Sequence, residues 1–67
     1  MWTIVYHCYG EWRIGDTYPL KRECIEALEM ETGSTITTYR ENGYYVTGLG
    51  HAIIKRCDLE LNGFTED

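Results

Sequence analysis

The chain has 67 residues and a net charge of −5, with 11 acidic and six basic side chains. A chain of this length forms one domain and buries only about 60% of the surface that its unfolded form exposes, which excludes the deep enclosed pocket of most enzymes. The acidic balance excludes the broad basic face by which general nucleic-acid binders neutralise phosphates. It suits a basic partner, although charge alone also keeps a small protein soluble.

The first residues and the cysteines indicate where the protein resides. Residues 1–5 are apolar over too short a run for a membrane span, and they lack the charged region of a secretory signal. The cysteines are odd in number and widely spaced, so Cys8, Cys24 and Cys57 do not form a disulfide framework. We expect free, buried structural thiols in a cytoplasmic protein with no membrane partner.

The N-terminal segment predicts a β-hairpin. Residues 2–9 are rich in β-branched and aromatic side chains, which favour a strand with successive side chains on opposite faces. Gly10-Glu11 fits a two-residue turn with glycine in the first position. A short second strand, residues 12–14, is expected to pair back on the first.

The next segment, residues 19–33, predicts a helix. Pro19 suits the first helical position, and Gly33 suits a left-handed cap after a helix end near Glu31 or Thr32. An apolar stripe at helical spacing is expected to face the core: Leu20, Cys24, Ala27 and Leu28, with Ile25 beside it.

This helix carries its charges in the order that its dipole disfavours. Lys21 and Arg22 lie in the first turn, whereas Glu26, Glu29 and Glu31 lie in the second half. The dipole favours the opposite arrangement by about 0.3–1 kcal/mol per exposed charge. We interpret the carboxylates as part of a surface that faces a partner, and a tolerated irregularity is the alternative.

The strongest local signal is a second hairpin. Residues 35–40 and 44–47 are strand-forming, and Asn42-Gly43 between them is the preferred type I′ turn. The predicted register pairs residues across the turn as follows: Arg40 with Tyr45, Tyr39 with Val46, and Thr38 with Thr47.

The C-terminal part is ambiguous between strand and helix. Within residues 52–61, Cys57, Leu59 and Leu61 alternate with polar residues, which favours a strand, although the apolar residues also fit one face of a helix. Residues 62–67 are interpreted as a flexible acidic tail.

The order ββαβββ predicts a single α+β domain, residues 1–67, with an antiparallel sheet of four or five strands and one helix packed on one face. The other face then has no cover within the chain, and exposed tyrosines there are typical interface anchors. The predicted partner-binding residues are acidic or aromatic: Glu11, Asp16, Glu26, Glu29, Glu31, Tyr9, Tyr44 and Tyr45.

Motifs for chemistry are absent from the sequence. It contains no nucleophile elbow, no phosphate-binding glycine loop and no Cys or His spacing of a structural zinc site. A thiolate pair of Cys8 or Cys57 with His51 would need the fold to bring the two side chains together. We expect no enzyme activity, no metal and no cofactor.

Size, acidity, the compact α+β order and the lack of a catalytic motif together resemble the small acidic inhibitors that bacteriophages encode, such as anti-CRISPR proteins and inhibitors of host RNA polymerase. The resemblance covers the whole chain and is one of type, so it carries over no residue. It implies a protein–protein interaction module that occludes a basic, nucleic-acid-binding surface of a larger host protein in the host cytoplasm, without binding nucleic acid itself. Two alternatives stay open: an aromatic sheet that binds single-stranded nucleic acid, and an assembly protein that forms a homodimer through the open sheet face.

Overall fold

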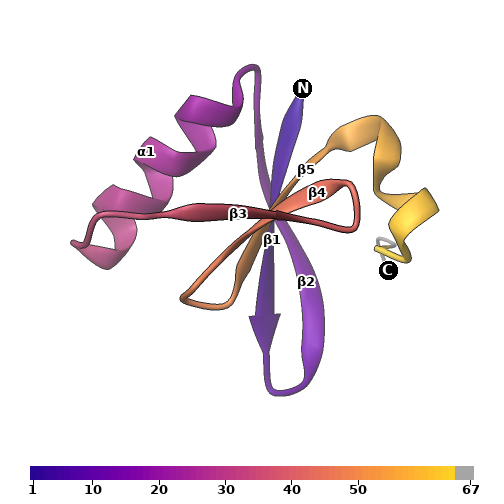
Figure 1. Ribbon diagram of the computed structural model, residues 1–67, viewed down its shortest axis with the longest axis horizontal. Helices are drawn as coiled ribbons and strands as arrows, with labels where there is room; N and C mark the ends of the chain where they lie inside the picture. The colour runs from indigo at the N-terminus through magenta and orange to yellow at the C-terminus, as the bar shows by residue number, and fades with distance from the viewer. Residues whose placement is uncertain (65–67) are drawn as a thin grey trace.

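The computed structural model describes residues 1–64. Within them the chain forms a five-stranded sheet, one α-helix and two short 3₁₀ turns (Figure 1). In chain order the elements are β1 (Trp2–Cys8), β2 (Glu11–Tyr18), α1 (Lys21–Thr32), β3 (Thr38–Glu41), β4 (Tyr44–Thr47), β5 (His51–Lys55), η1 (Arg56–Asp58) and η2 (Glu60–Asn62). The predicted α+β class and the order ββαβββ are confirmed.

The sheet has the strand order β2-β1-β5-β4-β3, and all its neighbouring strands are antiparallel. The connection that contains α1 therefore carries the chain from one edge strand to the other. Strand pairs twist by roughly 20–25° each, which accumulates over four pairs and explains why β3 crosses β1 and β2 in Figure 1. The helix lies on one side of this twisted sheet and the C-terminal turns lie on the other.

The second hairpin has the predicted geometry. Asn42 and Gly43 have φ values of 51° and 85°, as a type I′ turn requires, because both residues tolerate the left-handed region. All three predicted cross-strand pairs of β3 and β4 are present.

The first hairpin differs from the prediction in its turn. Cys8 pairs with Glu11, so the turn residues are Tyr9 and Gly10, with φ values of 51° and 80°. The predicted Gly10-Glu11 turn is wrong because β1 ends one residue earlier than expected.

Strand β2 is also longer than predicted, since it continues beyond residue 14 to Tyr18. Thr3 pairs with Thr17 and Val5 pairs with Ile14, which leaves two residues of β2 opposite one of β1. This bulge shifts the alternation of β2 by one residue and hides the second half of the strand from a period-two pattern.

The bounds of α1 agree with the prediction at one end. The helix ends at Thr32, and the N–H of Gly33, with a φ of 71°, donates to the carbonyl of Glu29 at 2.9 Å. At the other end it begins at Lys21, so Pro19 precedes the helix instead of occupying its first position. The cap residue is Leu20, whose side chain is 50% exposed and does not join the core as predicted.

The helix side of the sheet holds the first of two cores. Its buried residues come from α1, β1, β5 and the segment before β3: Ile4, Cys24, Leu28, Ile36 and Ile53. Partly buried residues surround them, namely Trp2, Tyr6, Tyr18, Ile25, Ala27 and Tyr45.

The opposite face of the sheet is covered by the chain itself, which corrects the prediction of an open face. Strand β5 ends at Lys55, not at residue 61, because Lys55 is already paired with Trp2, the first residue of β1. The chain then turns through η1 and η2 and places Leu59 and Phe64 on the sheet. The buried residues of this second core are Val5, Ala52, Ile54, Leu59 and Phe64.

Part of the predicted acidic tail is therefore folded. Asn62 ends η2, and Phe64 is buried with 6% exposure, whereas the rest of that tail, residues 65–67, lies outside the described residues. Among residues 1–64 the structure contains no helix with the length and apolar character that a membrane span needs.

Candidate functional site

The structure gives each of the three predicted acidic residues of α1 a partner within the fold. Glu29 accepts a hydrogen bond from the backbone N–H of Ile36 at 3.0 Å, so it fastens the chain that leaves the helix. Glu26 lies 3.6 Å from Arg22 one turn earlier, in an exposed pair. The reversed charge order of the helix thus has a partial structural reason.

Glu31, the third of the predicted acidic residues of α1, lies near Tyr6, as does the predicted residue Asp16. The Tyr6 hydroxyl donates to Glu31 at 3.2 Å. Burial of the Tyr6 ring, with the charges of Glu31 and Asp16, raises the pKa of Tyr6 to about 12. Neither carboxylate is within ion-pair distance of a Lys or Arg in the described part of the chain.

Glu11, another of the predicted acidic residues, lies near the group formed by Tyr6, Asp16 and Glu31. It lies on β2 beside Arg13, which is opposite Tyr6 in the ladder, and it contacts Arg13 at 3.6 Å in an exposed pair. We call Glu11, Asp16 and Glu31 the acidic end of the molecule. Glu26 and Glu29 are engaged elsewhere.

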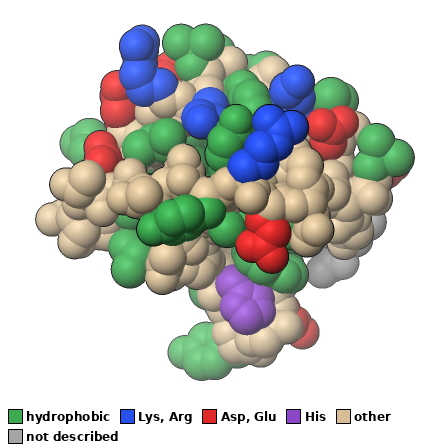
Figure 2. Space-filling model, in the orientation of Figure 1, with side chains coloured by type: hydrophobic (Ala, Val, Ile, Leu, Met, Phe, Trp, Pro, Cys, Tyr) green, Lys and Arg blue, Asp and Glu red, His purple; other side chains and the backbone are tan. Residues whose placement is uncertain are grey.

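The turn of the first hairpin is the most exposed aromatic site of the described chain. The side chain of Tyr9 is 105% exposed, and its backbone lies in the left-handed region that favours Gly, Asn or Asp. The hairpin extends beyond the other strands in Figure 1. In Figure 2 this protruding lower end carries hydrophobic and His side chains with an acidic side chain beside them.

The other two predicted aromatic residues lie on opposite faces, as strand alternation predicts. Tyr44 packs against Phe64, with ring centroids 5.5 Å apart, and therefore helps to hold the second core. Tyr45 lies on the helix side, 6.0 Å from Trp2. The two side chains therefore contribute to different faces of the molecule.

The fold also assembles a group of cations that the sequence did not reveal. Lys21 lies over the Tyr45 ring with its Nζ 3.7 Å from the centroid, and the Arg40 guanidinium lies 5.9 Å from the same ring. Lys55 lies 5.8 Å from the Trp2 ring. We call these five residues the basic-aromatic corner; Figure 2 shows Lys and Arg side chains gathered around hydrophobic ones in the upper part of that face.

Lys21, Arg22 and Arg13 do not form one basic group in the structure. In the structure Arg22 and Arg13 each contact a carboxylate, and only Lys21 joins the corner. The grouping arises because Lys55 pairs with Trp2 and Arg40 pairs with Tyr45 across the ladders. The Arg40–Tyr45 pair follows from the Asn42-Gly43 turn, whereas the Lys55–Trp2 pair joins distant parts of the chain and could not be inferred from local spacing.

The thiols offer no paired chemistry in the described residues. All three cysteines are free, and Cys24 is fully buried as predicted, where its thiol donates to the carbonyl of Trp2 at 3.6 Å. Burial raises the pKa of Cys24 to about 11, so the thiol stays protonated at neutral pH. Cys8 and Cys57 are exposed, contrary to prediction, and no group of three His, Cys, Asp or Glu within residues 1–64 can hold a metal.

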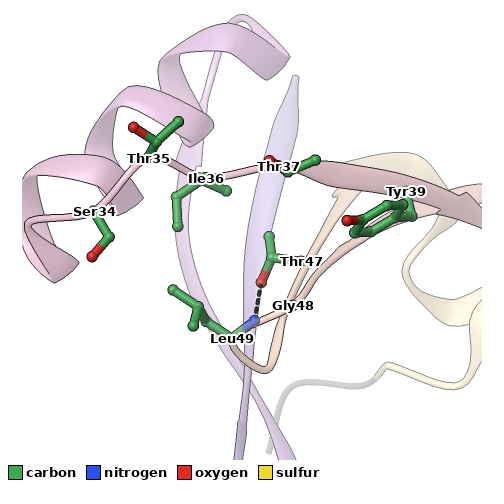
Figure 3. A pocket seen from close by; sticks show the side chains of 8 residues that line it. All are labelled: Ser34, Thr35, Ile36, Thr37, Tyr39, Thr47, Gly48 and Leu49. Atoms are coloured by element: carbon green, nitrogen blue, oxygen red, sulfur yellow. Dashed lines mark hydrogen bonds between the residues drawn. The ribbon is translucent and has the colours of Figure 1, made fainter.

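A shallow recess of about 230 Å³ lies between the segment that follows α1 and the β4–β5 loop (Figure 3). Its lining is mainly hydroxyl and apolar: Ser34, Thr35, Ile36, Thr37, Tyr39, Thr47, Gly48 and Leu49. The Thr47 hydroxyl accepts the backbone N–H of Leu49 at 3.3 Å, so it organises the loop. This lining brings no carboxylate, imidazole or thiol together, and it offers no acid–base pair for catalysis.

The chain was compared with protein-family models, with curated proteins and with solved structures. None of the three comparisons found a match.

Proposed function

We propose that the protein is a small protein–protein interaction module that binds a larger partner through the tip of its first hairpin and the acidic end beside it. The partner offers a basic surface, and the bound module occludes that surface. The resemblance to phage-encoded inhibitors implies that the basic surface of the partner is a nucleic-acid-binding site of a host protein. The exposed side chain of Tyr9 in a left-handed turn carries this proposal.

Tyr9 occupies a position where its residue type is locally unfavourable. The second hairpin uses Asn42 at the equivalent turn position, with the same φ of 51°. A tyrosine there stores strain of the order of 1 kcal/mol, and its fully exposed ring makes no compensating contact with residues 1–64. A residue that goes against the conformational preference of its position is typical of a functional site, and tyrosine is a common anchor of protein interfaces.

The acidic end supplies the charge for such an interface. Asp16 and Glu31 remain without a cationic partner in the described residues, and their negative charges reinforce each other near Tyr6. Complementary charge raises the association rate and selects basic partners over acidic ones. An aromatic tip beside unpaired carboxylates therefore suits a basic protein surface better than it suits a nucleic acid.

The partner can be identified by capture from a lysate of the cells in which the protein occurs, followed by a binding measurement with the purified partner. Asp16→Lys is expected to weaken binding about three- to tenfold at low salt, with a smaller difference at high salt, because the lost contact is a screened charge interaction. The inhibitor should also displace nucleic acid from the captured protein in a competition assay.

Glu60→Lys is the matched control, because it makes the same change in net charge at an exposed position of η2, outside the acidic end. It is expected to change the dissociation constant by less than about twofold, or roughly 0.4 kcal/mol. Equal weakening by both variants would show that only net charge matters, and the proposed acidic end would then be wrong.

A further inference from the structure

The basic-aromatic corner holds three of the six Lys and Arg residues of an acidic chain. None of Lys21, Arg40 and Lys55 is within ion-pair distance of a carboxylate in residues 1–64. They lie against the faces of two aromatic rings, and Asp58 lines the same recess as Arg40 and Lys55 but forms an ion pair with neither within residues 1–64. Cations grouped in this way repel each other, and binding an anion relieves that repulsion.

The corner also contains a space for a ligand. A recess of about 320 Å³ is lined by Trp2, Arg40, Gly43, Tyr45, Lys55 and Asp58. Two cations and two aromatic rings thus face the same opening.

Lys21 adds to the positive potential from the neighbouring element. It stands in the first turn of α1, where the helix dipole is also positive, and its ammonium group lies against the Tyr45 ring. The charge of Lys21 is unfavourable for the helix dipole, because it lies at the positive end. In the folded protein the same position places the ammonium group against Tyr45, as part of the basic-aromatic corner.

We propose that the basic-aromatic corner binds a nucleotide unit, with the phosphate held by Arg40 and Lys55 and the base lying against Trp2. A guanidinium binds phosphate oxygens in a bidentate manner, and an indole ring is a suitable surface for a base. A phosphate without a base would use the cations but not the rings. Asp58, the one carboxylate that lines the recess, opposes the phosphate and weakens its binding.

This site is independent of the proposed protein-binding function. The corner lies at the first turn of α1, whereas Glu31 of the acidic end lies in its last turn. One protein can therefore hold nucleic acid at one end and a nucleic-acid-binding protein at the other. The Tyr9→Asn variant should bind nucleotides like the wild type, so failure of either proposal can be told from failure of the other.

The test uses the full chain and a short, fluorescently labelled oligothymidylate, with binding followed by anisotropy at low salt. Lys55→Gln and Arg40→Gln are each expected to weaken binding about three- to tenfold. Each should also make the slope of log affinity against log salt shallower by about 0.7, the value for one phosphate contact with a single strand. Asp58→Asn is expected to tighten binding.

Arg22→Gln is the matched control, because it removes one exposed cation that is already paired with Glu26. It should leave binding within about twofold of the wild type. The NMR signals of the two indole N–H groups give a second readout, in which the Trp2 signal moves on addition of oligonucleotide and the Trp12 signal does not. A matching Trp2 shift with thymidine monophosphate would identify free nucleotide as a sufficient ligand, and a shift with the oligonucleotide alone would identify a strand.

Three outcomes would overturn the proposal. The first is no oligonucleotide binding by the wild-type protein at low salt. The second is equal weakening by Arg22→Gln and Lys55→Gln. The third is binding of polyglutamate as tight as that of the oligonucleotide, because the corner would then recognise negative charge of any kind, including an acidic peptide.

Discussion

Phe64→Ala is expected to lower the free energy of unfolding by about 3–5 kcal/mol, the usual cost of removing a buried phenylalanine side chain. Phe64 packs on the second face of the sheet, with its ring 5.4 Å from that of Trp12 and 5.5 Å from that of Tyr44. A domain of this length has a total stability of roughly 3–10 kcal/mol, so the loss is a large part of it. Urea unfolding monitored by tryptophan fluorescence measures the change.

Leu61→Ala is the control for this substitution. Leu61 belongs to the same C-terminal segment, but its side chain is 84% exposed, so its removal should cost less than about 0.5 kcal/mol. If Phe64→Ala were as mild as Leu61→Ala, the C-terminal segment would not cover the sheet. The sheet face would then be exposed, as the alternative of a homodimer through that face requires.

Gly15→Ala is expected to destabilise the protein by about 1–3 kcal/mol, the usual range for inserting a methyl group into a packed site. Gly15 lies beneath the ring of Tyr6, and a Cβ atom at residue 15 would overlap that ring and lie 3.1 Å from the carbonyl oxygen of Ile4. The ring has little room to move, since it packs edge-on against His51 at 5.2 Å and its hydroxyl is bonded to Glu31.

A double-mutant cycle with Tyr6→Ala tests this cause. The cost of Gly15→Ala should fall when the ring is absent, and the coupling between the two substitutions should be about 0.5–3 kcal/mol, as for residues in contact. Gly48→Ala is the control, because a Cβ at residue 48 meets nothing within 4 Å. An equal cost of Gly15→Ala with and without Tyr6 would rule out the ring as its source.

The parts of the fold that could be predicted from sequence depend on neighbouring residues. Asn42-Gly43 fixed both the turn and the register of β3 and β4, because a two-residue type I′ turn permits only one pairing of its flanking strands. The helix end at Gly33 followed from the same kind of local rule. The first hairpin was harder to place, because Tyr9 has none of the usual preference for a left-handed turn position.

The C-terminal segment could not be predicted, because its sequence imitates a strand. Cys57, Leu59 and Leu61 alternate correctly, yet only Leu59 is buried, since the chain turns through two 3₁₀ segments after β5. The pairing of β5 with β1 decides where β5 ends. No local pattern reports that pairing between the two ends of the chain.

The candidate sites were predictable to different degrees. The acidic end followed in part from the charges of Asp16 and Glu31, whereas the use of Glu29 to hold Ile36 depends on the path of the chain after the helix. The basic-aromatic corner draws Lys21, Arg40 and further residues from different elements that meet only in the folded sheet. Within the corner, only the pairing of Arg40 with Tyr45 could be predicted, from the Asn42-Gly43 turn, and residue spacing gave no information about the other members.

The central claim is that Tyr9 is retained for a partner at a cost to the fold, and two quantities measured on Tyr9→Asn test it most directly. Asparagine suits the left-handed turn, so the free energy of unfolding should rise by up to about 1 kcal/mol. The dissociation constant for the captured basic partner should rise at least about tenfold, or 1.4 kcal/mol, as expected for an interface anchor. Tyr39→Thr, which removes an exposed tyrosine from edge strand β3, should bind like the wild type. A Tyr9→Asn protein that binds the partner as tightly as the wild type would contradict the account.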